Sequence, residues 1–214
     1  FVVGEGCTNG NCDRRGDYLK ALSELLVSDL TWMGDQWNAN GAARLALLEN
    51  PQAGIAAIFT GMGSLSYGEQ AGERMKLGLM LNDPEEEHDC FADNTHNSHF
   101  YDGLGIRNVY NGEYLRVNGV LMQGPSVSDL VKAKDAALDT KLRTDLDHSV
   151  NQLLRIKMAA EAGFSYDMML ERGNKAGEAL IMGAVDGLVA QTRSIENAVA
   201  ALGLEIGEFE GSDS

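Results

Sequence analysis

Proline occurs at only three of the 214 positions of this chain, and its placement limits what the chain can fold into. Proline interrupts a helix interior because it lacks a backbone N–H and clashes with the preceding turn. The three residues are Pro51, Pro84 and Pro125. Long stretches without proline include residues 1–50, 52–83 and 126–214. The chain therefore has room for several long helices.

Apolar residues recur every three or four positions within these stretches, which is the spacing of an amphipathic helix. The clearest series is Leu138, Leu142, Leu146, Val150 and Leu153. The spacing predicts helices over about residues 13–38, 42–48, 55–81, 138–162 and 176–202. The third of these contains several glycines, each of which costs about 1 kcal/mol relative to alanine. We therefore expect close backbone packing or a kinked, interrupted rod there.

Residues 81–128 have a different character, being rich in Gly, Asn, Asp, His and aromatic residues. A connection of this length without regular structure is usually functional or disordered, and its aromatic residues argue against disorder. We predict an all-α, up-down helical bundle with one long irregular crossover loop at 81–128. The bundle is expected to form a single domain over residues 1–214, with an acidic tail at 205–214.

The chain is strongly acidic, with 32 Asp and Glu against 17 Lys and Arg and a formal net charge of −15. It has no basic stripe that could neutralise phosphates, so nucleic acid is excluded as a default partner. An anionic membrane surface is excluded for the same reason. No run of 18 or more apolar residues occurs, so we expect no transmembrane segment. Cations, other proteins and neutral small molecules remain as partners.

The acidic residues are concentrated between Asp83 and Asp102, where seven carboxylates accompany three of the four histidines and no Lys or Arg. Imidazole and carboxylate together suit iron, zinc or manganese, and oxygen-rich subsets suit calcium. His96 and His99 are three residues apart, so a helical turn would place both on one side. Candidate metal or ligand contacts are Asp93, His96, His99 and Asp102. The open alternative is that the histidines bind backbone carbonyls and hold an irregular loop.

Two carboxylates on the preceding helix, Glu69 and Glu73, continue the face that points inward. Burying both would be costly without a compensating cation. The neighbouring Arg74 or a bound metal could supply that charge. Alternatively, the helix bends at Gly68 and leaves both carboxylates in water beside Lys76.

Cys7 and Cys12 bracket a short polar loop that can bring their sulfurs together. A disulfide there fits an exported protein, whereas a soft-metal site would lack its second pair of thiols. The chain also starts at Phe1 rather than at methionine. We expect that an upstream segment has been removed as a signal peptide or by proteolysis, or that the chain is part of a longer protein.

Several segments together resemble the imelysin-like family, specifically its iron-regulated branch. They are GEQAGERM at 68–75, EHDCFADNTH at 87–96 and GIRNVY at 105–110, together with GCTNGNCDRR at 6–15. The resemblance implies an all-helical protein of two bundle-like halves, exported to the periplasm or held at the outer membrane and associated with iron acquisition. Members carry a Gly-x-His-x-x-Glu motif in the first half, and this chain has none. It is therefore expected to be the second half, with the N-terminal half of the same protein as partner.

The resemblance also implies which residues face the cleft between the halves. Carried over by position, they are Glu69, Glu73, Arg74, Asp93, Asn94 and His96. Together with the candidates from the acidic segment, the expected ligand-binding residues are Glu69, Glu73, Arg74, Asn94 and Asp102, and the expected metal ligands are Asp93, His96 and His99. We accordingly expect a non-catalytic protein of iron uptake that binds iron or an iron-containing ligand, with zinc or calcium as alternative metals. The alternatives are a metal-dependent peptidase, which the family name suggests, and a structural or interaction module.

Overall fold

The computed structural model describes residues 4–207 and 209, and the chain in it divides into two compact units, Phe1–Gly54 and Ile55–Ser214. The first unit contains the turn η1 (Gly4–Gly6) and the helices α1 (Cys12–Gln36) and α2 (Ala42–Glu49). These helices are the two that the apolar spacing predicts in this part of the chain. The single domain expected over residues 1–214 stays a prediction.

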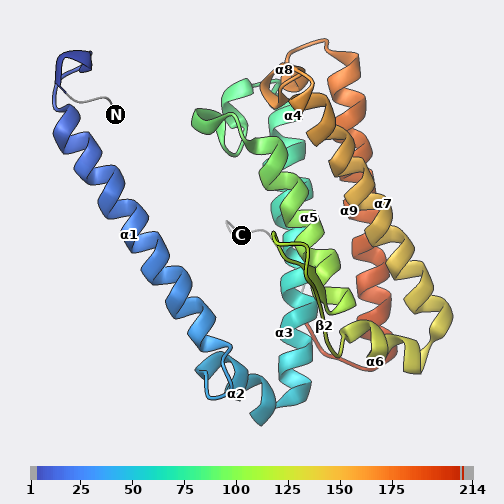
Figure 1. Cartoon of the computed structure of the whole chain (residues 1–214). Coiled ribbons are helices and arrows are strands. Elements are labelled where there is room, and N and C mark those ends of the chain that lie inside the picture. Colours follow the sequence, from blue (N-terminus) through green and yellow to red (C-terminus); the bar gives the residue numbers. More distant parts are fainter. Residues whose placement is uncertain (1–3, 208, 210–214) are drawn as a thin grey trace. The chain divides into compact units, whose positions relative to one another are not determined.

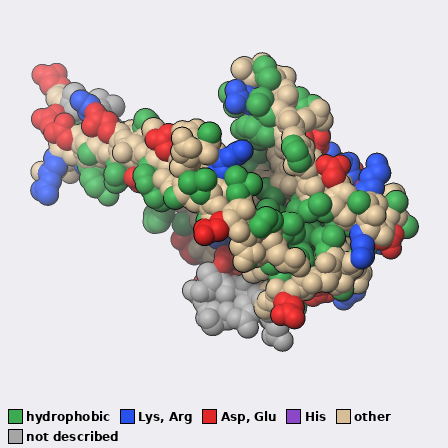
Figure 2. Space-filling model, turned by 90° about the horizontal axis from the view of Figure 1, so that it is seen from below, with side chains coloured by type: hydrophobic (Ala, Val, Ile, Leu, Met, Phe, Trp, Pro, Cys, Tyr) green, Lys and Arg blue, Asp and Glu red, His purple; other side chains and the backbone are tan. Residues whose placement is uncertain are grey.

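The disulfide Cys7–Cys12 stands directly before α1 and confirms the pairing expected for the two cysteines. The apolar stripe of α1 is exposed in the structure, and Figure 2 shows hydrophobic side chains on the surface of both units. The exposed residues of this stripe include Tyr18, Leu22, Leu25, Leu26, Leu30, Met33 and Trp37.

Long helical rods form the second unit and pack side by side (Figure 1). One rod is continuous through α3 (Pro51–Ser64), the π-helical segment η2 (Leu65–Lys76) and α4 (Leu77–Leu81). The others are α5 (Thr95–Asn111), α7 (Ala136–Glu161) and α9 (Lys175–Leu202). Short helices α6 (Val127–Lys134) and α8 (Tyr166–Leu170), the turns η3 (Pro84–Glu86) and η4 (Cys90–Ala92), and a hairpin of β1 (Glu113–Leu115) and β2 (Leu121–Gln123) connect them. The predicted all-α bundle is confirmed.

The prediction of an irregular crossover over residues 81–128 is wrong for its central part, because α5 is a regular helix of the bundle. Its buried positions follow a helical spacing but are mostly polar or small. They are Thr95, His99, Gly103, Ile106 and Tyr110. Hydrophobicity alone therefore misses this helix, since only its last buried turns are apolar.

The glycine-rich rod contains a π-helix rather than a kink. In η2 each backbone N–H bonds to a carbonyl five residues back instead of four, so one turn holds more residues than in an α-helix. This widening changes which side chains point inward. The buried residues of the segment are Ser66, Gln70, Ala71 and Met75. Glu69 and Glu73 are consequently turned partly toward solvent.

The core of the second unit consists of two apolar clusters separated by a polar contact. One cluster surrounds Phe59, Tyr110 and Leu146, and the other surrounds Met75, Leu153 and Ile181. Between them η2 meets α9 through the buried residues Ser66, Gln191 and Thr192.

Each of the long C-terminal helices α7 and α9 is followed closely by a glycine in the left-handed conformation. Gly163 follows α7 with φ +97°, and Gly203 caps α9 with φ +67°. A Cβ at Gly187 would lie 3.3 Å from the backbone of Ser149, so this glycine allows α7 and α9 to approach closely. Of the acidic tail predicted at 205–214, residues 208 and 210–214 lie outside the described residues.

Candidate functional site

An arginine held between two carboxylates marks the place where η2 packs beside α5. Arg74 Nη2 lies 3.1 Å from Glu69 Oε2 on its own helix, and Nη1 lies 3.5 Å from Asp102 Oδ2 on α5. All three side chains are partly exposed, with relative accessibilities of 29% for Arg74, 17% for Glu69 and 31% for Asp102. We call these residues the Arg74 cluster. A cation was expected beside Glu69 and Glu73. Arg74 is that cation for Glu69, and its second partner is Asp102 rather than Glu73.

Burial raises the pKa of Asp102 above its usual range, and this effect outweighs the lowering by Arg74 and His88. The neighbouring Arg74 guanidinium opposes the effect of burial, because it favours the charged carboxylate. Removing Arg74 would leave two partly desolvated acids without their cation. The geometry can hold an acidic ligand group by exchange for one of these carboxylates, because a guanidinium binds carboxylates through several N–H donors.

One turn before Asp102 on α5 lies the fully buried imidazole of His99. Gln70 Nε2 donates a 2.7 Å hydrogen bond to the backbone carbonyl of His99 and so ties η2 to α5. The His99 ring lies edge-on to Tyr166, with centroids 5.2 Å apart, and stacks with His88 at 6.2 Å. Burial, assisted by His88 and Arg74, lowers the pKa of His99 to about 3. The ring is therefore neutral at physiological pH.

The turn that precedes α5 and the first turn of that helix carry the predicted ligands Asp93, Asn94 and His96. Asp93 is exposed in the left-handed region at φ 48°, and Asn94 follows it as the N-cap position. Asn97 Nδ2 donates to Asn94 Oδ1 at 2.8 Å and lies 3.1 Å from Nε2 of His96. Lys157 of α7 donates to Asn97 Oδ1 at 2.7 Å, which fixes this turn against the bundle. His96 is half-buried.

Comparison with known protein families identifies the chain. The sequence profile described as Imelysin matches residues 6–195, which is most of the chain. The chain belongs to the imelysin family. This confirms the resemblance at the level of the family, while the assignment to its iron-regulated branch stays a prediction. No curated protein matches the sequence.

In this imelysin chain the predicted site residues fall into two groups. Glu69, Arg74 and Asp102 are in contact, and His99 lies next to them beneath Gln70. Asp93 and Asn94 belong to the turn before α5, His96 lies in the first turn of α5, and Glu73 forms no ion pair within residues 4–207 and 209. Across the same residues, no three His, Cys, Asp or Glu side chains stand close enough to hold a metal ion. The metal ligands Asp93, His96 and His99 stay a prediction.

Three buried polar residues of this imelysin chain were not predicted from the sequence. They are Gln70, Glu87 and Tyr166, each with a buried oxygen that has no partner in the described structure. Glu87 follows the exposed residues Glu85 and Glu86 but is itself only 8% exposed, and burial raises its pKa. Gln70 is buried because η2 is a π-helix, and no local pattern in the sequence predicts that.

None of the helices in the described part of the chain combines the length and the apolar character that crossing a bilayer requires. This agrees with the expectation from the sequence.

Proposed function

We propose that this member of the imelysin family is an exported, non-catalytic binding protein of iron uptake, and that its ligand is an iron-containing complex with acidic groups. The observation that carries the proposal is the Arg74 cluster, a partly exposed guanidinium between two carboxylates beside an acidic and histidine-containing helix. An acidic group of the ligand takes the place of Glu69 or Asp102 on Arg74. The N-terminal half of the same protein is the partner that closes the cleft.

A complexed iron suits these residues better than a bare ion. His96, His99 and Asp102 follow each other at intervals of three along α5 and so share one side of the helix. His96 is half-buried, and its Nδ1 is a buried nitrogen without a hydrogen-bond partner in the described structure, so a turn of the ring toward the ligand would supply an imidazole donor to iron. Because fewer than three protein ligands are close together, a chelate that brings its own oxygen donors fills the rest of the coordination sphere.

Export is supported by the disulfide Cys7–Cys12. Disulfides persist in oxidising compartments such as the bacterial periplasm and are rare in the cytosol. The proposed location is the periplasm or the periplasmic face of the outer membrane. Release of the protein into the periplasmic fraction, with the disulfide detected by mass after alkylation without reduction, tests this location.

Calorimetric titration of the full-length protein with ferric citrate tests the binding function. The expected result is saturable binding that becomes at least about tenfold weaker in Arg74→Ala, since a charge-assisted hydrogen bond to the ligand contributes about 1.5 kcal/mol or more. Weaker binding is also expected in His96→Ala. Arg155→Ala, which removes an exposed arginine of α7, is the matched control and should bind as the unsubstituted protein does. Citrate without iron tests whether the metal is required.

Two results would overturn the proposal. One is no heat of binding with ferric citrate at millimolar concentration. The other is equal affinity in Arg74→Ala and Arg155→Ala, which would show that the ligand does not use the Arg74 cluster.

A further inference from the structure

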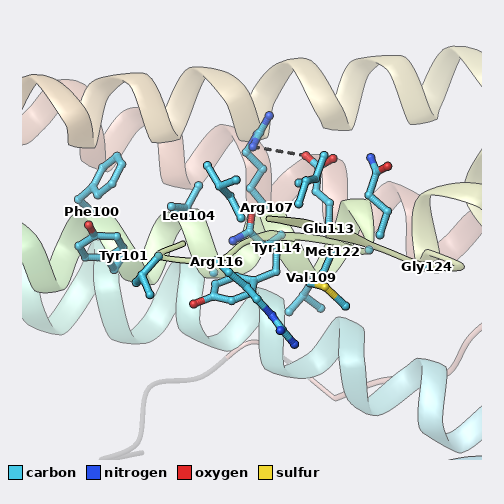
Figure 3. A pocket seen from close by; sticks show the side chains of 17 residues that line it. Phe100, Tyr101, Leu104, Arg107, Val109, Glu113, Tyr114, Arg116, Met122 and Gly124 are labelled. Atoms are coloured by element: carbon cyan, nitrogen blue, oxygen red, sulfur yellow. Dashed lines mark ion pairs between the residues drawn. The ribbon is translucent and has the colours of Figure 1, made fainter. Parts of the chain in front are cut away.

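A hollow with a volume of about 1260 Å³ lies between α5 and the β1–β2 hairpin (Figure 3). We call it the hairpin cleft. Its lining comes from residues 100–124 and includes none of the Arg74 cluster. The principal side chains are Tyr101, Val109, Tyr114, Arg116, Leu121 and Met122. The cleft is therefore a site separate from the one proposed for iron.

Backbone geometry holds the hairpin beside the helix. Gly112 ends α5 with φ +63°, and a Cβ there would lie 2.9 Å from the carbonyl oxygen of Gly124. The Gly124 N–H donates to the Gly112 carbonyl at 3.0 Å, which closes the base of the hairpin. At its tip, Gly119 has φ +80° and its N–H donates to the Arg116 carbonyl at 2.9 Å. The cleft is thus built by turns that require glycine.

The walls of the cleft are apolar and incompletely covered. Tyr114 pairs with Met122 across the hairpin, and they are 54% and 43% exposed. Tyr101 and Val109 on α5 are 60% and 52% exposed. Exposure of adjoining apolar side chains to water is unfavourable. A two-stranded hairpin has no interior in which these side chains could be buried. An occupant with an apolar body would remove these side chains from water.

The two arginines of the cleft differ in their charge balance. Arg107 is 2.6 Å from Asp147 and 3.6 Å from Glu113, so its charge is already compensated (Figure 3). Arg116 is exposed and forms no ion pair with a residue in 4–207 or 209. Figure 3 shows its side chain extending away from the Arg107–Glu113 pair. In a chain of net charge −15, this uncompensated guanidinium beside an apolar wall is complementary to an anion.

We propose that the hairpin cleft binds an amphipathic organic anion. The apolar body of the ligand packs against Tyr101, Tyr114 and Met122, and its carboxylate pairs with Arg116. A fatty acid and an aromatic carboxylic acid both have this chemistry. The proposal does not depend on iron binding, because the two sites share no residue.

Fluorescence titration of the full-length protein with 1-pyrenebutyrate, and displacement of that probe by oleate, tests the proposal. The neutral analogues 1-pyrenebutanol and oleyl alcohol reveal the contribution of the charge. Arg116→Ala is expected to weaken binding of the acids at least tenfold and to leave the alcohols unchanged, whereas Arg116→Lys retains part of the affinity. Arg193→Ala, at an exposed arginine of α9, is the matched control and should bind both acids normally.

A second variant tests the apolar wall. Met122→Glu places a negative charge at an exposed position, so the fold should survive, which circular dichroism and the melting temperature verify. It is expected to abolish binding of both acids. Oleate and benzoate-type acids are compared as competitors of 1-pyrenebutyrate. Displacement by oleate alone indicates an aliphatic ligand, and displacement by benzoate-type acids alone indicates an aromatic ligand. Either result supports the proposal. Failure of both acids to bind, or equal affinity in Arg116→Ala and Arg193→Ala, would overturn it.

Arg74→Ala separates the two proposals. It should leave pyrenebutyrate binding unchanged even if it abolishes binding of ferric citrate. Loss of pyrenebutyrate binding in a correctly folded Arg74→Ala protein would contradict the assignment to the hairpin cleft.

Discussion

Gln191 Nε2 donates a 2.8 Å hydrogen bond to Ser66 Oγ and thereby joins α9 to the π-helical segment η2 in the interior of the bundle. Thr192 Oγ1 lies 3.0 Å from the same hydroxyl, and Ser66 Oγ lies 3.1 Å from the Leu188 carbonyl oxygen. All of these polar groups are buried between the two apolar clusters. The contact fixes the register of η2 on α9, and with it the direction in which Arg74 points.

Ser66→Ala should lower the free energy of unfolding by about 1–3 kcal/mol, because it leaves the Gln191 amide buried without its acceptor. Urea unfolding followed by circular dichroism measures the difference. Thr140→Ala is the control, since it removes an exposed hydroxyl of α7 that bonds only its own helix. Its expected effect is within about 0.5 kcal/mol. Equal decreases in the free energy of unfolding of the two variants would show that the buried hydrogen bond contributes no more to stability than the exposed one.

Gly177→Ala should destabilise the protein by about 1–3 kcal/mol, because the added methyl group has no space. A Cβ at this position would lie 2.3 Å from the Met169 carbonyl oxygen and 2.4 Å from its Cα, so the backbone of α8 would have to move. Gly105→Ala on α5 is the matched substitution, with nothing within 4 Å of the added Cβ. There alanine should stabilise the helix by up to about 1 kcal/mol. Melting temperatures that shift in the same direction would contradict this prediction.

Stability should fall as the pH decreases from 6.5 toward 3, because of His99. In the unfolded chain this histidine has a pKa near 6.5, whereas burial lowers it to about 3 in the folded protein. Between these values the unfolded state binds a proton that the folded state does not bind. The contribution to the free energy of unfolding is fully present above pH 6.5 and decreases by about 1.4 kcal/mol per pH unit below it.

Comparison of variants separates the contribution of His99 to the pH dependence of stability from the contributions of other titrating groups. His99→Phe should lose less stability between pH 7 and pH 5 than the unsubstituted protein, by about 2 kcal/mol. The exposed His148 of α7 provides the control, and His148→Phe should keep the original pH dependence. NMR titration gives a direct measurement, in which the His99 ring stays neutral at pH 5. A His99 ring that titrates near pH 6.5 would refute the prediction.

The long helices were predictable because their signals are local. The stripe around Leu142, Leu146 and Leu153 is buried as its spacing predicts, and Gly163 and Gly203 end their helices in the left-handed conformation that glycine tolerates. Cys7 and Cys12 are close in sequence, so their disulfide could also be predicted. For the same reason the resemblance to the imelysin family, which rests on short motifs, is confirmed.

The helix α5 was not predicted because its buried face contains Thr95, His99 and Gly103 as well as apolar residues. Hydrophobic periodicity cannot detect such a stripe, since polar residues become interior only where another helix covers them. Gly103 illustrates this, because a Cβ there would lie 2.3 Å from Leu153 Cδ1 of α7.

The sequence by itself determined that this protein is a helical bundle of the imelysin family, because helix spacing, helix ends and family motifs are properties of neighbouring residues. Only the tertiary structure decided that Arg74 bridges Glu69 and Asp102 while Glu73 stands apart. The physical reason is that the π-helical widening of η2 rotates its side chains relative to an α-helix, and contacts with α5 and α9 hold that conformation. Such contacts join residues that are far apart in the chain, so no local sequence pattern predicts them.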